Sequence, residues 1–193
     1  KEDYLLRHEI PFPHFNRLEG RPVKPSALYE ECRAEGAVFE EVYGHERPRW
    51  FAPEGTDAKD IYGFRRTKLH HIVGAEVRAV RERAGIMDIS AFTKVEVSGP
   101  NARAFLDGLV ANRLPSPGRI ALTHILNEAG RIELETTVVC LAEDRFYLAC
   151  AAFFEQRLVD NLTFARKGED IVITNCSSEW GAFALNGPRS RDI

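Results

Sequence analysis

The chain has 193 residues, of which 44% are hydrophobic and 28% are charged, and its formal net charge is −3. This composition is typical of a globular protein, and the absence of a basic run argues against a nucleic-acid-binding role. No apolar stretch approaches the length of a membrane span, and the first residues do not resemble a signal peptide.

The four cysteines lie far apart and form no Cys-x-x-Cys motif. We therefore expect neither a structural zinc site nor a disulfide framework, and we place the protein in a reducing compartment. His70 and His71 are adjacent. Neighbouring residues diverge on a helix, so this pair is expected to lie at a helix start or on the surface rather than to bind a metal.

Residues 1–70 are predicted to be irregular. They contain six prolines and many aromatic residues but few periodic runs, and one short helix is expected at residues 27–35. The aromatic and basic segment 43–51 is interpreted as a packed linker, with a binding surface as the alternative. This part of the chain is expected to be a connector that packs on its neighbours.

Residues 71–193 predict an α+β order of elements. Apolar spacing indicates helices, and alternation indicates strands. Pro100 is expected to open a helix, and Gly187-Pro188 another, so the two Gly-Pro phrases form either a weak internal repeat or a common joint. The predicted helices are 71–84, 100–110 and 154–168, and the predicted strands are 92–99, 120–126, 131–141, 145–150, 171–175 and 182–185.

Glu133 and Glu135 are two residues apart on one predicted strand, so their side chains are expected on the same face. Paired carboxylates can perform acid–base work or hold a ligand that carries N–H groups. A solvated strand face is the alternative, and spacing alone favours it.

Four phrases resemble one family. Residues 44–51, Gly-His-Glu-Arg-Pro-Arg-Trp-Phe, resemble the Gly-Trp-Glu-Arg-Pro-x-Trp-Phe phrase of dimethylglycine and sarcosine dehydrogenases. Residues 87–94, 126–132 and 184–191 resemble successive phrases of the glycine-cleavage T-protein, an aminomethyltransferase. The order of the phrases matches the connector and the folate domain of these flavoenzymes.

The resemblance implies that residues 1–70 are the connector that follows a flavin domain and that residues 71–193 begin an aminomethyltransferase-like, folate-binding α+β domain. The whole enzyme would use FAD to demethylate an N-methyl amine of the dimethylglycine or sarcosine type. Tetrahydrofolate would accept the carbon as 5,10-methylenetetrahydrofolate. The expected compartment is a bacterial cytoplasm or the mitochondrial matrix, and the segment alone is expected to be inactive.

The resemblance also implies site residues. Glu135 stands where the family has a catalytic aspartate, and Phe92, Tyr147 and Ala149 stand at folate-binding positions, with no metal site. Two alternatives stay open: a catalytically silent relative with a binding or regulatory role, such as the pyruvate dehydrogenase phosphatase regulatory subunit, or a stand-alone aminomethyltransferase or demethylase. The glutamate in place of aspartate favours the silent relative, whereas the connector argues against the stand-alone enzyme.

Overall fold

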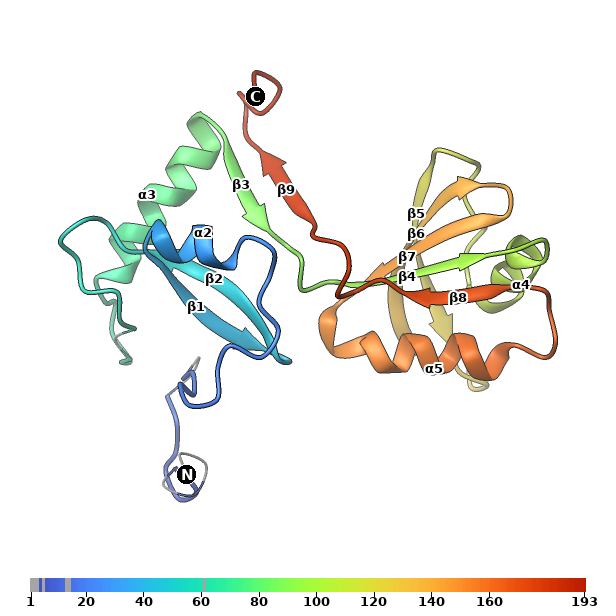
Figure 1. The fold of residues 1–193 in the computed structure, drawn as a ribbon, viewed down its shortest axis with the longest axis horizontal. Helices are drawn as coiled ribbons and strands as arrows, with labels where there is room; N and C mark the ends of the chain where they lie inside the picture. Colours follow the sequence, from blue (N-terminus) through green and yellow to red (C-terminus); the bar gives the residue numbers. More distant parts are fainter. Residues whose placement is uncertain (1–3, 5, 13–14, 61) are drawn as a thin grey trace. The chain divides into compact units, whose positions relative to one another are not determined.

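The computed structural model describes residues 4, 6–12, 15–60 and 62–193, which form two compact units (Figure 1). Unit 1 comprises residues 1–89 and 181–193, and unit 2 comprises residues 90–180. Pro13, which belongs to the predicted connector, lies outside the described residues. The boundary at residue 70 between connector and folate domain stays a prediction about the whole protein.

Unit 2 is built on a five-stranded antiparallel sheet in the order β5-β6-β7-β4-β8. Two helices and a short 3-10 turn complete it. All five predicted strands of this unit and both predicted helices are confirmed, with ends that shift by a few residues. The elements are β4 (Thr93–Ser98), α4 (Ala102–Leu109), β5 (Ile120–Leu126), β6 (Ile132–Ala142), β7 (Arg145–Cys150), η1 (Ala152–Phe154), α5 (Glu155–Ala165) and β8 (Val172–Asn175).

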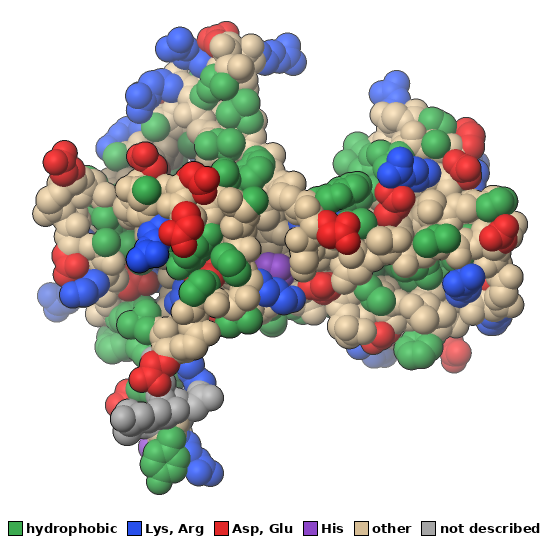
Figure 2. Space-filling model, viewed as in Figure 1, with side chains coloured by type: hydrophobic (Ala, Val, Ile, Leu, Met, Phe, Trp, Pro, Cys, Tyr) green, Lys and Arg blue, Asp and Glu red, His purple; other side chains and the backbone are tan. Residues whose placement is uncertain are grey.

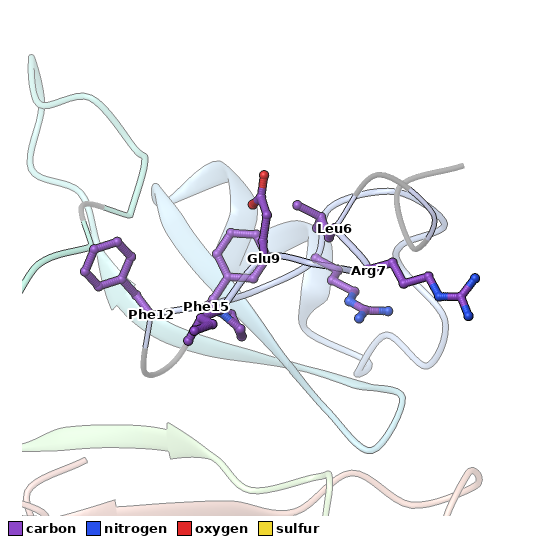
Figure 3. A pocket seen from close by; sticks show the side chains of 8 residues that line it. Leu6, Arg7, Glu9, Phe12 and Phe15 are labelled. Carbon is purple, nitrogen blue, oxygen red and sulfur yellow. The ribbon is translucent and has the colours of Figure 1, made fainter.

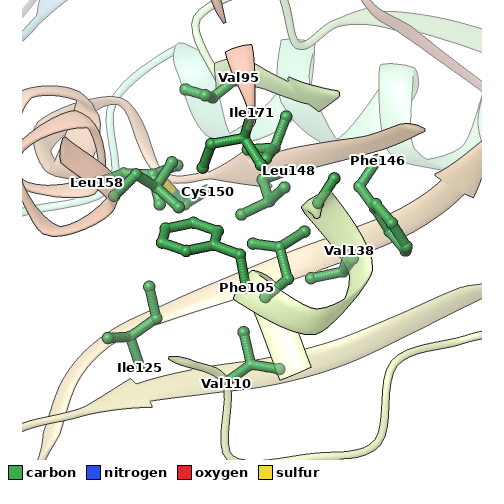
Figure 4. Packing of buried hydrophobic residues seen from close by; sticks show 14 of the residues in the cluster. Val95, Phe105, Val110, Ile125, Val138, Phe146, Leu148, Cys150, Leu158 and Ile171 are labelled. Carbon is green, nitrogen blue, oxygen red and sulfur yellow. The ribbon is translucent and has the colours of Figure 1, made fainter. Parts of the chain in front are cut away.

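The core of unit 2 lies between the two helices and one face of the sheet (Figure 4). Because side chains alternate along a strand, every second residue of β4, β6 and β7 enters this core. Leu106 of α4, Leu158 of α5 and Leu148 of β7 all lie in this core, and none of the three has any exposed surface. The opposite face of the sheet therefore carries the remaining half of each strand's side chains.

In the part of unit 1 that the structure describes lie helices α2 and α3 and two two-stranded antiparallel sheets, one formed by β1 and β2 and the other by β3 and β9. The helices confirm the predictions at 27–35 and 71–84, and β9 confirms the predicted strand at 182–185, each with shifted ends. The elements are α2 (Tyr29–Ala34), β1 (Ala37–Val42), β2 (His45–Phe51), α3 (Leu69–Glu82), β3 (Gly85–Asp88) and β9 (Phe183–Asn186).

The hairpin of β1 and β2 contradicts the prediction that the first 70 residues are irregular. Tyr43 and Gly44 turn the chain with φ angles of 53° and 85°, as a tight hairpin requires. Pro48 lies inside β2 and hides the strand in the sequence, because proline cannot donate a ladder hydrogen bond. The register shifts beside it, where Val38 faces Trp50 and Phe39 faces Pro48.

The same hairpin explains why the Glu-Arg-Pro-x-Trp-Phe phrase has this composition. The Glu46 side chain is 1% exposed and receives hydrogen bonds from the Nε and Nη2 atoms of Arg21, which also bonds the carbonyl of Phe39. Trp50 is 1% exposed and donates from Nε1 to Asp60 at 3.0 Å. Glu46 therefore links the hairpin to the preceding segment through Arg21, and Trp50 links it to the following segment through Asp60.

The two Gly-Pro phrases begin in the same way and continue differently. Gly99 and Gly187 both follow a strand with positive φ, at 125° and 113°. A Cβ atom on Gly99 would lie 2.6 Å from the Asp170 carbonyl oxygen, and one on Gly187 would lie 2.6 Å from the carbonyl oxygen of Arg83. Helix α4 follows Gly99, as predicted, but residues 187–191 form turns, so the second predicted helix start is wrong.

The surface of each unit mixes charge types. On the face drawn in Figure 2, Lys and Arg side chains are interspersed with Asp and Glu side chains over each unit. In the part of the chain that the structure describes, no helix has both the length and the apolar character needed to cross a membrane.

Candidate functional site

Three of the four predicted site residues share one face of the unit 2 sheet. Glu135 lies on β6, and Tyr147 and Ala149 lie on β7. Their strand neighbours Leu134 and Leu148 are fully buried in the core, so alternation directs the three predicted residues to the opposite side. We call this side the open face; it is lined by Leu122, Glu135, Thr137, Tyr147 and Ala149.

The open face carries apolar surface as well as polar groups. Leu122 is 54% exposed and lies opposite Thr137, whose other neighbour across the sheet is Ala149. These small and aliphatic side chains lie in adjacent strands and present apolar surface on the open face. Such a surface can accept the face of a planar ring, which buries apolar area without requiring a deep cavity.

The Glu135 carboxylate lies at the edge of this surface, and 60% of the side chain is exposed. Its Oε2 atom is 3.3 Å from Nε2 of His124, the residue directly opposite on β5. Among the described residues, the carboxylate has His124 as its polar side-chain partner, and its exposed surface leaves accepting capacity toward solvent or a ligand. Sequence reasoning missed His124, although a predicted hairpin register would have placed the two side chains together.

Glu133 does not form a carboxylate pair with Glu135. The register of β5 and β6 shifts at this point, so Glu133 has no partner on β5, and such a bulge turns a side chain away from the regular alternation. Glu133 instead receives a hydrogen bond from Asn127 and lies 3.4 Å from Arg157 of α5. The expectation that both glutamates act on one face is therefore not supported by their contacts.

Tyr147 forms an aromatic pair with Trp180. The ring centroids are 5.6 Å apart and the planes differ by 15°, which is a stacked arrangement. Burial, and secondarily the nearby Cys176 thiol, raises the pKa of the Tyr147 phenol, so the phenol stays neutral and able to donate at neutral pH. Sequence reasoning missed Trp180.

Phe92 lies directly before β4 and is 47% exposed. The ring stacked on Tyr147 is that of Trp180, so the described aromatic contacts do not bring Phe92 and Tyr147 together. The backbone at Phe92 is instead held by Lys94, whose Nζ donates to the carbonyls of Ser90 at 2.6 Å and Phe92 at 2.7 Å.

Lys94 is the third residue that sequence reasoning missed. Its position in an alternating strand predicts a solvated side chain, yet it is only 1% exposed. A buried ammonium is stable only when hydrogen-bonded, and the two carbonyls meet part of that requirement. The backbone of Lys94 also receives a bond from Cys176 N and gives one to Ser177 Oγ, which fixes the turn that carries Trp180.

Other hollows lie in unit 1. A hollow of about 710 Å³ is lined by the first part of the chain, including Leu6, Phe12 and Phe15 (Figure 3). A second, of about 520 Å³, lies between Trp50 and helix α3, beside Val73 and Val77. Neither holds a predicted site residue. In the described residues, no group of three or more His, Cys, Asp or Glu side chains is placed to bind a metal, and the rings of His70 and His71 contact each other.

Comparison with known families gives a match over most of the chain. The family model described as "GCVT N-terminal domain" matches residues 28–193. The crystal structure of glycine cleavage system aminomethyltransferase T from Bartonella henselae superposes with a TM-score of 0.72 and 26% identity, covering 88% of this chain and 42% of that chain. The α+β, aminomethyltransferase-like fold predicted from the sequence is thus confirmed.

Two curated relatives match over the whole chain. Mitochondrial dimethylglycine dehydrogenase of Mus musculus is 30% identical over 197 residues, and mitochondrial sarcosine dehydrogenase of the same species is 29% identical over 234 residues. The matched regions make up 22% and 25% of these relatives, so the chain spans about a quarter of their length or less. The predicted resemblance to the dimethylglycine and sarcosine dehydrogenase family is confirmed.

Proposed function

Because the chain belongs to the GCVT N-terminal domain family and resembles a segment of dimethylglycine and sarcosine dehydrogenases, we propose that its open face contributes to a tetrahydrofolate site in a larger amine-demethylating oxidoreductase. The observation that carries the proposal is the gathering of Glu135, Tyr147 and Ala149 on one accessible sheet face. The family resemblance implies a catalytic role for Glu135 and folate-binding roles for Tyr147 and Ala149; Phe92, its other folate-binding position, lies before β4.

The residues present fit a folate. The apolar side chains of Leu122 and Ala149 suit the face of a pterin, and the Tyr147–Trp180 pair offers a further aromatic surface. The Glu135 carboxylate can accept hydrogen bonds from ring N–H groups, and the neutral Tyr147 phenol can donate one. When bound, tetrahydrofolate would supply the two nitrogens that take up the one-carbon unit as 5,10-methylenetetrahydrofolate.

The role proposed for Glu135 is to place a negative charge where positive charge develops. An oxidised N-methyl amine is an iminium cation, and a fixed carboxylate beside it stabilises that charge and can accept the proton that a folate nitrogen loses. FAD, which would accept the electrons from the amine, is proposed for a part of the protein outside this chain. The isolated segment is therefore proposed to be inactive.

The amine is proposed to be of the dimethylglycine or sarcosine type, as the names of the two mouse relatives indicate. Both relatives are named as mitochondrial proteins. This supports a location in the mitochondrial matrix, or in the cytoplasm if the protein is bacterial.

The proposal is tested with Glu135→Gln in the full-length enzyme. Removal of one acid–base group typically costs on the order of 100-fold in rate, so methylenetetrahydrofolate formation should fall by about that factor while amine-dependent flavin reduction stays unchanged. Glu133→Gln is the matched control, because this neighbour is bound to Asn127 and Arg157 instead of facing the site. A wild-type yield from Glu135→Gln would refute the role of the open face.

A second candidate function is favoured by the exposure of Glu135. A carboxylate that is 60% exposed also fits a solvated strand face in a catalytically silent, ligand-binding or regulatory relative. The wild-type enzyme separates the two functions. Incubation with dimethylglycine or sarcosine that yields neither flavin reduction nor methylenetetrahydrofolate would favour the silent relative.

A further inference from the structure

The contact between His124 and Glu135 is set by the regular part of the sheet. The two residues are direct partners across β5 and β6, and their side chains project to the same face. The backbone of His124 is held from two directions. Strand β6 pairs with β5 on one side, and the His124 carbonyl accepts a hydrogen bond from Ala111 N at 2.9 Å. Its imidazole is 29% exposed, so it is more firmly enclosed than the carboxylate that it contacts.

Glu135 needs such a contact more than an aspartate would. A glutamate side chain has one more rotatable bond than an aspartate, so its carboxylate samples more positions when nothing holds it. In the described part of the chain, His124 is the single side chain whose polar atoms reach this carboxylate, at 3.3 Å. Misplacement of a reacting group by about 1 Å is enough to slow a reaction strongly.

We propose that His124 is a positioning residue that holds the Glu135 carboxylate over the open face. This contact would compensate for the extra rotatable bond of glutamate, whereas an aspartate at this position would not need it. This inference rests on the proposed folate function. An iminium that is not captured by tetrahydrofolate is hydrolysed: one water molecule is consumed, and formaldehyde, the free amine and a proton are released. Poor positioning should therefore divert carbon from methylenetetrahydrofolate to formaldehyde.

The test is a double-mutant cycle in the full-length enzyme with His124→Leu and Glu135→Asp. His124→Leu should lower the tetrahydrofolate-dependent kcat about fivefold, the loss expected for one partly exposed charge-assisted hydrogen bond, and formaldehyde should rise correspondingly. Flavin reduction should stay at the wild-type rate. In the Glu135→Asp background, where the shortened side chain withdraws from the imidazole, His124→Leu should have no further effect.

Two more variants separate positioning from folding. His124→Gln retains an N–H donor of similar reach and should restore most of the methylenetetrahydrofolate yield. His124→Asn is polar but too short to reach the carboxylate, so it should reproduce the loss without placing an apolar side chain on the surface. A merely structural role of His124 would lower flavin reduction or the thermal midpoint together with the yield.

The inference is overturned if His124→Leu leaves the product ratio unchanged, or if it causes the same fivefold loss in the Glu135→Asp background as in the wild-type background. Its failure differs from failure of the proposed function. When Glu135→Gln lowers the yield and both His124→Leu and His124→Asn do not, only the positioning role is refuted. When Glu135→Gln retains the wild-type yield, the proposed function itself is refuted.

Discussion

Replacing Glu46 with glutamine is expected to destabilise unit 1 without changing its fold. The Glu46 side chain is 1% exposed and Arg21 is 13% exposed, and two guanidinium nitrogens of Arg21 bind the carboxylate. The hydrogen bond to Glu46 raises the pKa of Arg21. A guanidinium stays protonated at neutral pH even without that bond, so the arginine remains charged in the variant. The variant therefore leaves a cation largely withdrawn from water beside an amide.

The size of the effect follows from this geometry. Removing one partner of a fully buried ion pair costs about 3–5 kcal/mol. Arg21 keeps its hydrogen bonds to the carbonyls of Phe39 and Arg17, and part of its side chain reaches water. We therefore expect a loss of about 2–3 kcal/mol, below the range for full burial. With a urea m-value of about 2 kcal/mol/M, the midpoint should fall by roughly 1 M.

The two tryptophans allow the loss to be assigned to a unit, because Trp50 lies in unit 1 and Trp180 lies in unit 2. Urea unfolding is followed by Trp50 emission in a Trp180→Phe background. Glu40→Gln is the matched control on the same hairpin, since its contact with Arg47 is a half-exposed pair at 4.0 Å, worth about 0–1 kcal/mol. Equal midpoints for Glu46→Gln and Glu40→Gln would refute the buried-anchor argument.

Two further predictions concern unit 2. Leu148→Ala should destabilise this unit by about 2–5 kcal/mol, because the Leu148 side chain is fully buried. Leu141→Ala should have a small effect, because the Leu141 side chain is 45% exposed. Denaturation followed by Trp180 emission compares the two variants. Burial raises the pKa of the Cys150 thiol from 9.0 to about 11, so little reactive thiolate is present at pH 8. Iodoacetamide at pH 8 should therefore leave Cys150 unmodified in the folded protein and label it in urea. Peptide mass spectrometry would measure the labelling. Since the folded pKa is the higher one, the stability that this thiol contributes is complete below pH 9 and is lost as the pH rises toward 11. Rapid labelling of Cys150 in the folded protein would contradict the burial argument.

The sequence predicted unit 2 well because its strands alternate cleanly. Residues such as Val95 and Val97 of β4 enter the core while Glu96 between them does not, and this pattern is visible without a structure. In unit 1 the helices were predicted, but the hairpin of β1 and β2 was missed, because Pro48 interrupts the strand pattern and because the hairpin is held by polar pairs distant in sequence. The bond between Arg21 and Glu46 joins positions 25 residues apart, and no local pattern reveals it.

The candidate site was predicted in part for a similar reason. The family resemblance singled out Glu135, Tyr147 and Ala149, and the sheet places the three on one face, while their roles stay predictions. His124 and Trp180 became visible only through contacts between strands and loops. Phe92 precedes β4, so the regular geometry that fixes the other three does not extend to it.

The close approach at Gly99 and Gly187 also limits how this chain can change over time. At both positions a methyl group would press into a backbone carbonyl, and neither carbonyl can move aside as a flexible side chain could. A change to alanine in either codon would therefore be removed by selection even though both glycines lie far from Glu135 in the sequence. Random mutagenesis with selection for folded protein should return these two codons nearly free of substitutions, in contrast to the Gly63 codon, since Gly63 has open space around it and no positive φ.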